Sequence, residues 1–71
     1  MITKMDRKDI AERLKALRGE ETKASVAAAL GVTPMAVGLY ESGQRIPNDD
    51  IKIRYAILYG KTVDEIFFTA R

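Results

Sequence analysis

A tight turn between two short helical segments is the feature that most limits how this chain can fold. Residues 23–30 and 34–42 both have helical spacing, and only the three residues Gly31-Val32-Thr33 separate them. A turn of three residues is too short for the two helices to pack side by side and antiparallel. It therefore predicts a large crossing angle and a second helix that projects from the domain. The turn also needs a residue that tolerates positive φ, which Gly31 supplies.

Apolar spacing on these two segments predicts which side chains face inward. Ala27 lies in the middle of the first helix and is small enough for close contact between helices. Val37 and Tyr40 lie about one turn apart and are expected to anchor the second helix, which leaves Met35 and Leu39 on its outer face. Exposed apolar side chains on one helix indicate a surface that binds a partner.

Helix signals recur along the chain and predict an all-α fold. Each of the first four expected helices has a capping side chain before it and a glycine after it. The first follows the cap Asp6 and is expected to end at Gly19 in the left-handed conformation, the fourth covers residues 49–59, and a short fifth begins at Thr62. Five helices with short connections are typical of one compact bundle. Residues 1–71 are therefore interpreted as a single domain, with residues 1–5 as a candidate flexible segment.

The absence of two residue types removes most catalytic chemistry. The 71 residues contain no histidine and no cysteine, which excludes a Ser-His-Asp triad, a disulfide, and metal sites built on imidazole or thiolate. A chain this short also has little room for an enclosed substrate pocket. It is interpreted as a non-enzyme without metal or cofactor. No apolar run approaches the ~20 residues that cross a bilayer, and the lack of cysteine fits a cytoplasmic location.

Charge is distributed unevenly along the sequence. The formal net charge is only +2, but most lysines and arginines lie within residues 4–23. Between Ala24 and Gln44 the only charged residue is Glu41. If the helix over residues 34–42 contacts a polyanion, it does so with few charges of its own, and cationic contacts must come from elsewhere.

One set of spacings extends over much of the chain: Ala27, Leu30-Gly31-Val32-Thr33, Val37, Tyr40-Glu41-Ser42-Gly43, Arg45 and Pro47. This pattern resembles the phage repressor/Cro-type helix-turn-helix domains. The resemblance implies a compact five-helix lambda-repressor-like fold and a sequence-specific transcriptional regulator of double-stranded DNA. It further implies a homodimeric repressor on an inverted-repeat operator, with residues 34–42 in the major groove.

The resemblance also assigns roles to individual residues. Positions that carry hydrogen-bonding side chains in the family are apolar here, which leaves three interpretations open. The helix contacts thymine methyl groups while its backbone approaches the DNA at Gly38, or it relies on DNA shape, or it does not read DNA. The implied phosphate or flanking contacts are Lys23, Thr33, Gln44 and Arg45, the base-facing residues are Pro34, Met35 and Leu39, and a structural ion pair joins Arg18 to Glu41.

The fourth helix is apolar on nearly every side, and a domain this small cannot cover it completely. With the aromatic residues that follow, it predicts a homodimer interface that includes Leu58, Phe67 and Phe68. The alternative is that these side chains complete the core. No ligand-binding domain is expected. Two other functions stay open: a protein-interaction module that retains the helix-turn-helix fold, or the controller or antitoxin of a small operon.

Overall fold

The computed structural model of this chain describes residues 6–68, so the expectation for residues 1–5 lies outside the described residues. Residues 6–68 form four α-helices and a final π-helix, and they contain no β-strand. The predicted all-helical fold is confirmed. In chain order the elements are α1 (Arg7–Arg18), α2 (Lys23–Leu30), α3 (Pro34–Ser42), α4 (Asp49–Tyr59) and η1 (Asp64–Phe68).

Side-chain caps determine where the four α-helices begin. In each case a side-chain oxygen accepts a hydrogen bond from a backbone N–H of the first turn, at 2.9 to 3.1 Å. These N–H groups have no acceptor within the helix, so each cap supplies a missing partner. The capping residues are Asp6, Thr22, Thr33 and Asn48.

Two glycines end their helices in different conformations. Gly31 has φ 77° and ψ 31°, the left-handed conformation that the turn between α2 and α3 requires. The prediction that Gly19 is also left-handed is wrong, because its φ of 57° is combined with a ψ of −123°. These angles match the first central position of a type II′ turn. The N–H of Glu21 closes that turn by donating to the Arg18 carbonyl at 3.1 Å.

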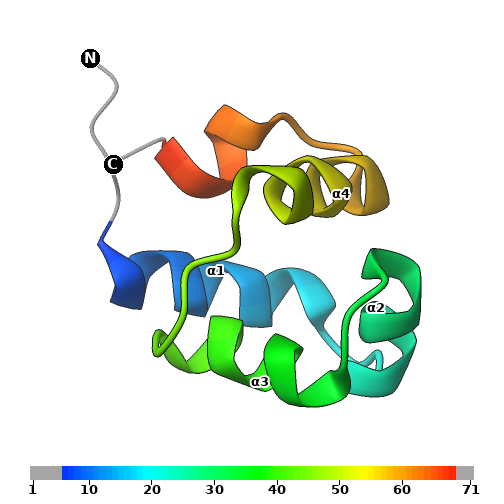
Figure 1. Ribbon diagram of the computed structural model, residues 1–71. Helices are drawn as coiled ribbons and strands as arrows, with labels where there is room; N and C mark the ends of the chain where they lie inside the picture. Colours follow the sequence, from blue (N-terminus) through cyan, green and yellow to red (C-terminus); the bar gives the residue numbers. More distant parts are fainter. Residues whose placement is uncertain (1–5, 69–71) are drawn as a thin grey trace.

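Every helix contributes to one hydrophobic core. In Figure 1, α1 lies between α3 on one side and α4 with η1 on the other, while α2 contacts both α3 and α4 at one end. Because each helix buries one side, the surface of α3 that faces away from α1 and α2 is left open. One side chain from each helix is completely buried: Leu14, Leu30, Val37, Tyr55 and Ile66.

The last helix differs from the prediction in its start and in the direction of one aromatic ring. It begins at Asp64 and winds as a π-helix, while Thr62 caps it: the Thr62 hydroxyl accepts from the Glu65 N–H, and the Glu65 carboxylate accepts from the Thr62 N–H. Phe67 is only 1% exposed and meets Tyr55 edge-on at 6.1 Å. Its predicted place in a dimer interface is therefore wrong, because this ring completes the core.

Candidate nucleic-acid interface

Helices α2 and α3 meet at a bend of 104°, the large crossing angle expected from a three-residue turn. The carbonyl of Ala27 accepts from the N–H groups of Gly31 and Val32, at 2.8 and 3.0 Å, which fixes the path of the chain through the turn.

No single helix in residues 6–68 is long and apolar enough to cross a membrane, and only the bent pair α2 and α3 reaches that length and composition together.

The turn is also held from α4. Arg54 Nη1 donates to the carbonyl of Leu30 at 2.9 Å, which satisfies an acceptor that the end of α2 leaves open. A Cβ atom on Gly31 would lie 2.8 Å from this guanidinium nitrogen. Glycine at position 31 therefore provides both the positive φ and the space for Arg54. A side chain from a later helix thus contacts the turn where α2 ends.

The outer face of α3 is short of polar side chains. Met35 is 75% exposed and Pro34 is exposed beside it, whereas Ala36, Val37 and Tyr40 are buried. Leu39, which the sequence predicts to be exposed, is half-buried. From Pro34 to Leu39, the face that α3 presents to solvent therefore offers small and apolar groups, which can contact thymine methyl groups but cannot form hydrogen bonds to base edges. The exposed hydroxyl of Ser42, in the last turn, is the polar group that α3 adds.

An ion pair joins α1 to α3 below this face. Arg18 Nε donates to both carboxylate oxygens of Glu41, at 2.8 and 3.0 Å, and its Nη1 donates to the Glu21 carbonyl at 2.6 Å. The Glu41 side chain is 5% exposed and that of Arg18 is 16% exposed. The hydrogen bond with Glu41 raises the pKa of Arg18 above its already high ordinary value. Glu41 is therefore fully engaged by a cation of its own chain.

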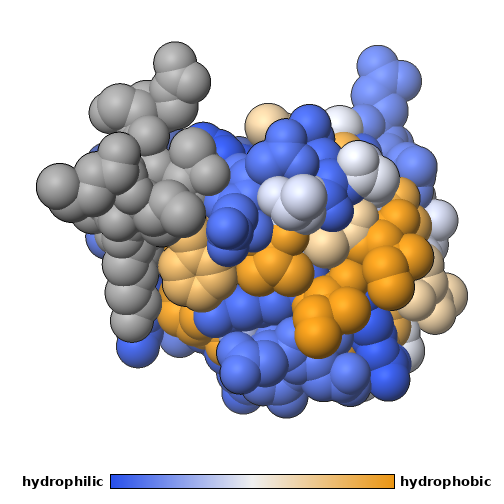
Figure 2. Space-filling model, turned by 90° about the horizontal axis from the view of Figure 1, so that it is seen from above, coloured by the Kyte–Doolittle hydropathy of each residue, from blue (hydrophilic) through white to orange (hydrophobic). Residues whose placement is uncertain are grey.

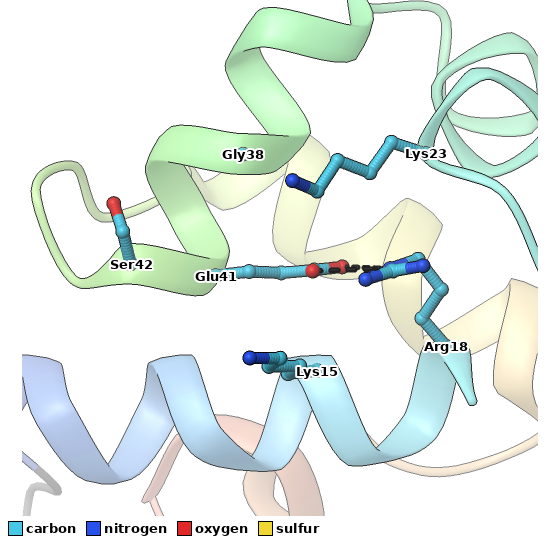
Figure 3. A pocket seen from close by; sticks show the side chains of 6 residues that line it. All are labelled: Lys15, Arg18, Lys23, Gly38, Glu41 and Ser42. Atoms are coloured by element: carbon cyan, nitrogen blue, oxygen red, sulfur yellow. Dashed lines mark hydrogen bonds and ion pairs between the residues drawn. The ribbon is translucent and has the colours of Figure 1, made fainter. Parts of the chain in front are cut away.

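Figure 3 shows a pocket of about 150 Å³ between α1, the start of α2 and one side of α3. Lys23 extends from α2 toward α3, and its Nζ would lie 3.9 Å from a Cβ atom on Gly38. Lys15 points into the same space from α1. Neither lysine has an ion-pair partner within residues 6–68. The lining residues are Lys15, Arg18, Lys23, Gly38, Glu41 and Ser42.

The charge balance of this pocket favours an anion. Three cationic side chains line it, and its single carboxylate is already neutralised by Arg18. Two lysines thus remain available beside the outer face of α3. A phosphate oxygen is the acceptor that such ammonium groups bind in nucleic-acid complexes. Within the described residues, no group of acidic or metal-ligating side chains could hold a metal ion.

The remaining predicted contacts lie at the two ends of α3. Thr33, at the start, is exposed and its hydroxyl accepts from the Ala36 N–H at 3.1 Å. Gln44 and Arg45, beyond the other end, have exposed side chains, and both of their N–H groups donate to the Leu39 carbonyl at 3.1 and 3.3 Å. The predicted phosphate-binding side chains therefore surround α3 and are not gathered at a single point.

Sequence reasoning missed Lys15. Its place in the pocket follows from its position one turn before Arg18, because the pairing of Arg18 with Glu41 directs this side of α1 toward α3. The spacing of the two cations was the signal available in the sequence. Its meaning depended on knowing which helix lies opposite.

Comparison with known proteins gives one family match. Residues 14–66 of this chain match the helix-turn-helix family. No curated protein matches in sequence. Because the matched segment runs from the middle of α1 into η1, it contains the turn, all of α3 and every residue that lines the pocket.

Solved structures with a similar fold come from different kinds of protein. The P22 c2 repressor in complex with a synthetic operator has a TM-score of 0.78 and 20% identity, and the alignment covers 82% of this chain and 91% of that chain. The restriction-modification controller protein C.AhdI from Aeromonas hydrophila has a TM-score of 0.76 and 24% identity, with coverage of 84% and 94%.

A third similar structure belongs to an enzyme. Hydroxypropylphosphonic acid epoxidase from S. wedmorenis has a TM-score of 0.75 and 28% identity over 92% of this chain. The alignment covers only 36% of the epoxidase chain, so its activity is not transferred to the present protein. All three structures share the helical arrangement described above.

Proposed function

This chain belongs to the helix-turn-helix family, and we propose that it is a transcriptional regulator that binds double-stranded DNA. In the finer form of the proposal, it is a repressor that binds an inverted-repeat operator as a homodimer, with α3 in the major groove. The P22 c2 repressor and the controller protein C.AhdI support this proposal through their similar fold and size. A controller or antitoxin role in a small operon is compatible with it.

The observation that carries the proposal is the pair of available lysines beside the outer face of α3. Lys23 lies next to Gly38, where α3 has no side chain to block a close approach, and Lys15 lines the same pocket. A phosphate bound by these ammonium groups would bring the duplex against Met35 and the α3 backbone. Phosphate contacts would set the position of the protein, and the apolar face would then meet base edges or thymine methyl groups.

The proposal is tested first by selecting bound sequences from random duplexes. An enriched inverted repeat is the expected result, with affinity that falls steeply as salt increases. Failure to bind any duplex at low salt would contradict the DNA-binding function. Recovery of DNA with no common sequence would instead support binding by phosphate contacts alone.

A second measurement tests the assigned cations on a duplex that holds one half-site. Lys23→Ala and Arg45→Ala should each weaken binding to all sequences about equally, and each should reduce the slope of log affinity against log salt by about 0.9. Lys61→Ala is the matched control, because Lys61 is exposed near the end of α4, which lies across α1 from α3. Equal effects of all three substitutions would argue against the assignment.

A protein-interaction module is the second candidate, and the exposure of Met35 favours it. This side chain is 75% exposed on a helix face with little hydrogen-bonding capacity. Met35→Asp would then abolish binding to a protein partner, while wild-type protein would show no sequence preference in the duplex selection. Selection of a defined operator would eliminate this candidate as the main function.

A further inference from the structure

A second surface, on the outer face of α4, is apolar but belongs neither to the core nor to the α3 interface. Ile53 and Ile57 lie four residues apart, and therefore on one side of the helix, with exposures of 51% and 76%. Leu58 lies next to them and is 36% exposed. We call Ile53, Ile57 and Leu58 the α4 apolar face. Figure 2 shows that apolar side chains gather over this side of the molecule between hydrophilic margins.

The α4 apolar face does not serve the fold or the proposed DNA contacts. Ile51 and Tyr55 already supply the buried side of α4, so the exposed isoleucines point away from the core. In Figure 1, α4 and α3 lie on opposite sides of α1, which separates this face from the cationic pocket. Aliphatic side chains also offer nothing to a phosphate. Apolar side chains grouped on one exposed helix face instead indicate a protein partner.

Charges at the two ends of α4 indicate which partner fits. Asp50 lies about one turn before Ile53, and its side chain is 70% exposed. Arg54 Nη2 contacts one of its carboxylate oxygens at 3.2 Å, which leaves the other oxygen open to a second cation. Lys61 follows the helix at its other end and is exposed. It acts electrostatically on Glu65, whose carboxylate is hydrogen-bonded to the N–H of Thr62.

The α4 apolar face thus has an acidic group at one end and a basic group at the other. We propose that a second copy of this chain covers it, with the two α4 helices antiparallel about a two-fold axis. In this arrangement Asp50 of each copy faces Lys61 of the other, and Ile57 lies nearest the axis with Ile53 on one flank of the contact and Leu58 on the other. A two-fold axis makes such a contact self-complementary, because the acidic end of each α4 meets the basic end of the other. The two helix dipoles also attract each other, because they are antiparallel.

This inference rests on the proposed homodimer and identifies its interface. In the interface proposed here, Ile53 and Ile57 take the place that the sequence analysis predicted for Phe67, which is buried in the core. Because the α4 apolar face is small, it fits a dimer that forms and dissociates with protein concentration, unlike the extensive interfaces of obligate dimers. The α3 helices remain uncovered in both copies, since α4 lies across α1 from them.

The test is sedimentation of the full chain over a range of concentrations. Wild-type protein should pass from monomer to dimer as concentration rises, and Ile57→Asp should remain monomeric throughout. Met35→Asp is the matched control, because Met35 is 75% exposed and Ile57 is 76% exposed, so both changes place a charge on an exposed apolar site. Met35→Asp should dimerise like wild type.

A charge exchange tests the antiparallel arrangement. Asp50→Lys and Lys61→Asp should each weaken the dimer, and the double variant should restore it, because opposite charges face each other again. Circular dichroism checks that each variant is folded. A wild-type protein that stays monomeric, an Ile57→Asp variant that still dimerises, or a double variant that is no better than the single ones would overturn the inference.

DNA binding separates this inference from the proposed function. Ile57→Asp should bind a single half-site as wild type does, but should lose affinity for the complete inverted repeat by at least about tenfold, equivalent to about 1.4 kcal/mol. If Ile57→Asp stays dimeric and binds the repeat normally, the interface is wrong and the function stands. If the dimer behaves as described but no form binds DNA, the function is wrong and the interface stands.

Discussion

The side chain of Arg18 joins the end of α1 to the last turn of α3 by donating from Nε to both carboxylate oxygens of Glu41, at 2.8 and 3.0 Å. Without Arg18, Glu41 would be a carboxylate with a 5% exposed side chain and no ion-pair partner. Removing one member of such a pair leaves the other without its partner, which costs more than the intact pair contributes. The Arg18–Glu41 contact therefore holds α3 in position, although the intact pair adds little to the free energy of unfolding.

A double-mutant cycle on this pair gives the first prediction. Arg18→Met and Glu41→Gln should each lower the thermal midpoint, and Arg18→Met should lower it more, because it leaves the carboxylate unpaired. The double variant should lose less than the sum of the two single losses. Circular dichroism melts of the four proteins measure this. Strictly additive losses would show that the two side chains do not interact in solution.

The second prediction concerns Gly38, which lies within α3 where a Cβ atom would have only an ordinary contact with Lys23 Nζ, at 3.9 Å. Gly38→Ala should therefore stabilise the helix by up to about 1 kcal/mol, which raises the thermal midpoint by roughly 4–8 °C in a domain of this size. It should also weaken DNA binding, because the added methyl group keeps the α3 backbone away from the duplex. A stabilised variant with unchanged DNA affinity would exclude close backbone approach at this position.

The third prediction separates the two roles assigned to Thr33. Thr33→Ala removes the acceptor for the Ala36 N–H and should cost about 1 kcal/mol of stability, whereas Thr33→Ser keeps it. If the same hydroxyl binds phosphate, Thr33→Ala should also reduce DNA affinity and Thr33→Ser should not. Thr62→Ala removes a comparable cap at η1, away from α3. DNA affinity that falls equally in the Thr33→Ala and Thr62→Ala variants would reflect lost stability alone.

The fourth prediction is a loss of stability in alkali. The hydroxyl groups of Tyr55 and Tyr59 are buried without a hydrogen-bond partner in the described part of the chain, and burial raises the pKa of both above the ordinary value of about 10. The contribution of their raised pKa values to the free energy of unfolding is complete below that pH. It decreases as the pH rises above about 10, because the unfolded chain then ionises while the folded chain stays neutral.

Thermal melts at pH 7 to 11 check this behaviour. The midpoint should fall above about pH 10, and Tyr55→Phe should reduce the fall. At neutral pH, Tyr55→Phe should be neutral or stabilising, because the hydroxyl it removes has no partner. A large loss of stability at pH 7 would mean that the hydroxyl makes a hydrogen bond in solution.

Local signals were sufficient to predict most of the helices. The bounds of α2, α3 and α4 agree with their predicted caps and closing glycines. This agreement has a physical basis, because a cap such as Thr33 or Asn48 acts on N–H groups three residues away in its own segment. Such interactions are contained in the sequence and do not require knowledge of the tertiary fold.

The errors concern contacts between distant segments. Gly19 was assigned the wrong conformation because the turn that reverses the chain after α1 was not recognised. Phe67 was placed at an interface because nothing in its neighbourhood showed that Tyr55 would meet its ring. For the same reason Lys15 was overlooked in the pocket, and Ile53 and Ile57 were not distinguished from the buried residues of α4.

The open face of α3 has a consequence for how such a regulator diversifies. Pro34 and Met35 project into solvent, while the anchoring of the helix depends on Val37 and Tyr40 beneath them. Selection can therefore replace the outward side chains without endangering folding, so that a lineage acquires new target genes by a few exchanges on an unchanged scaffold.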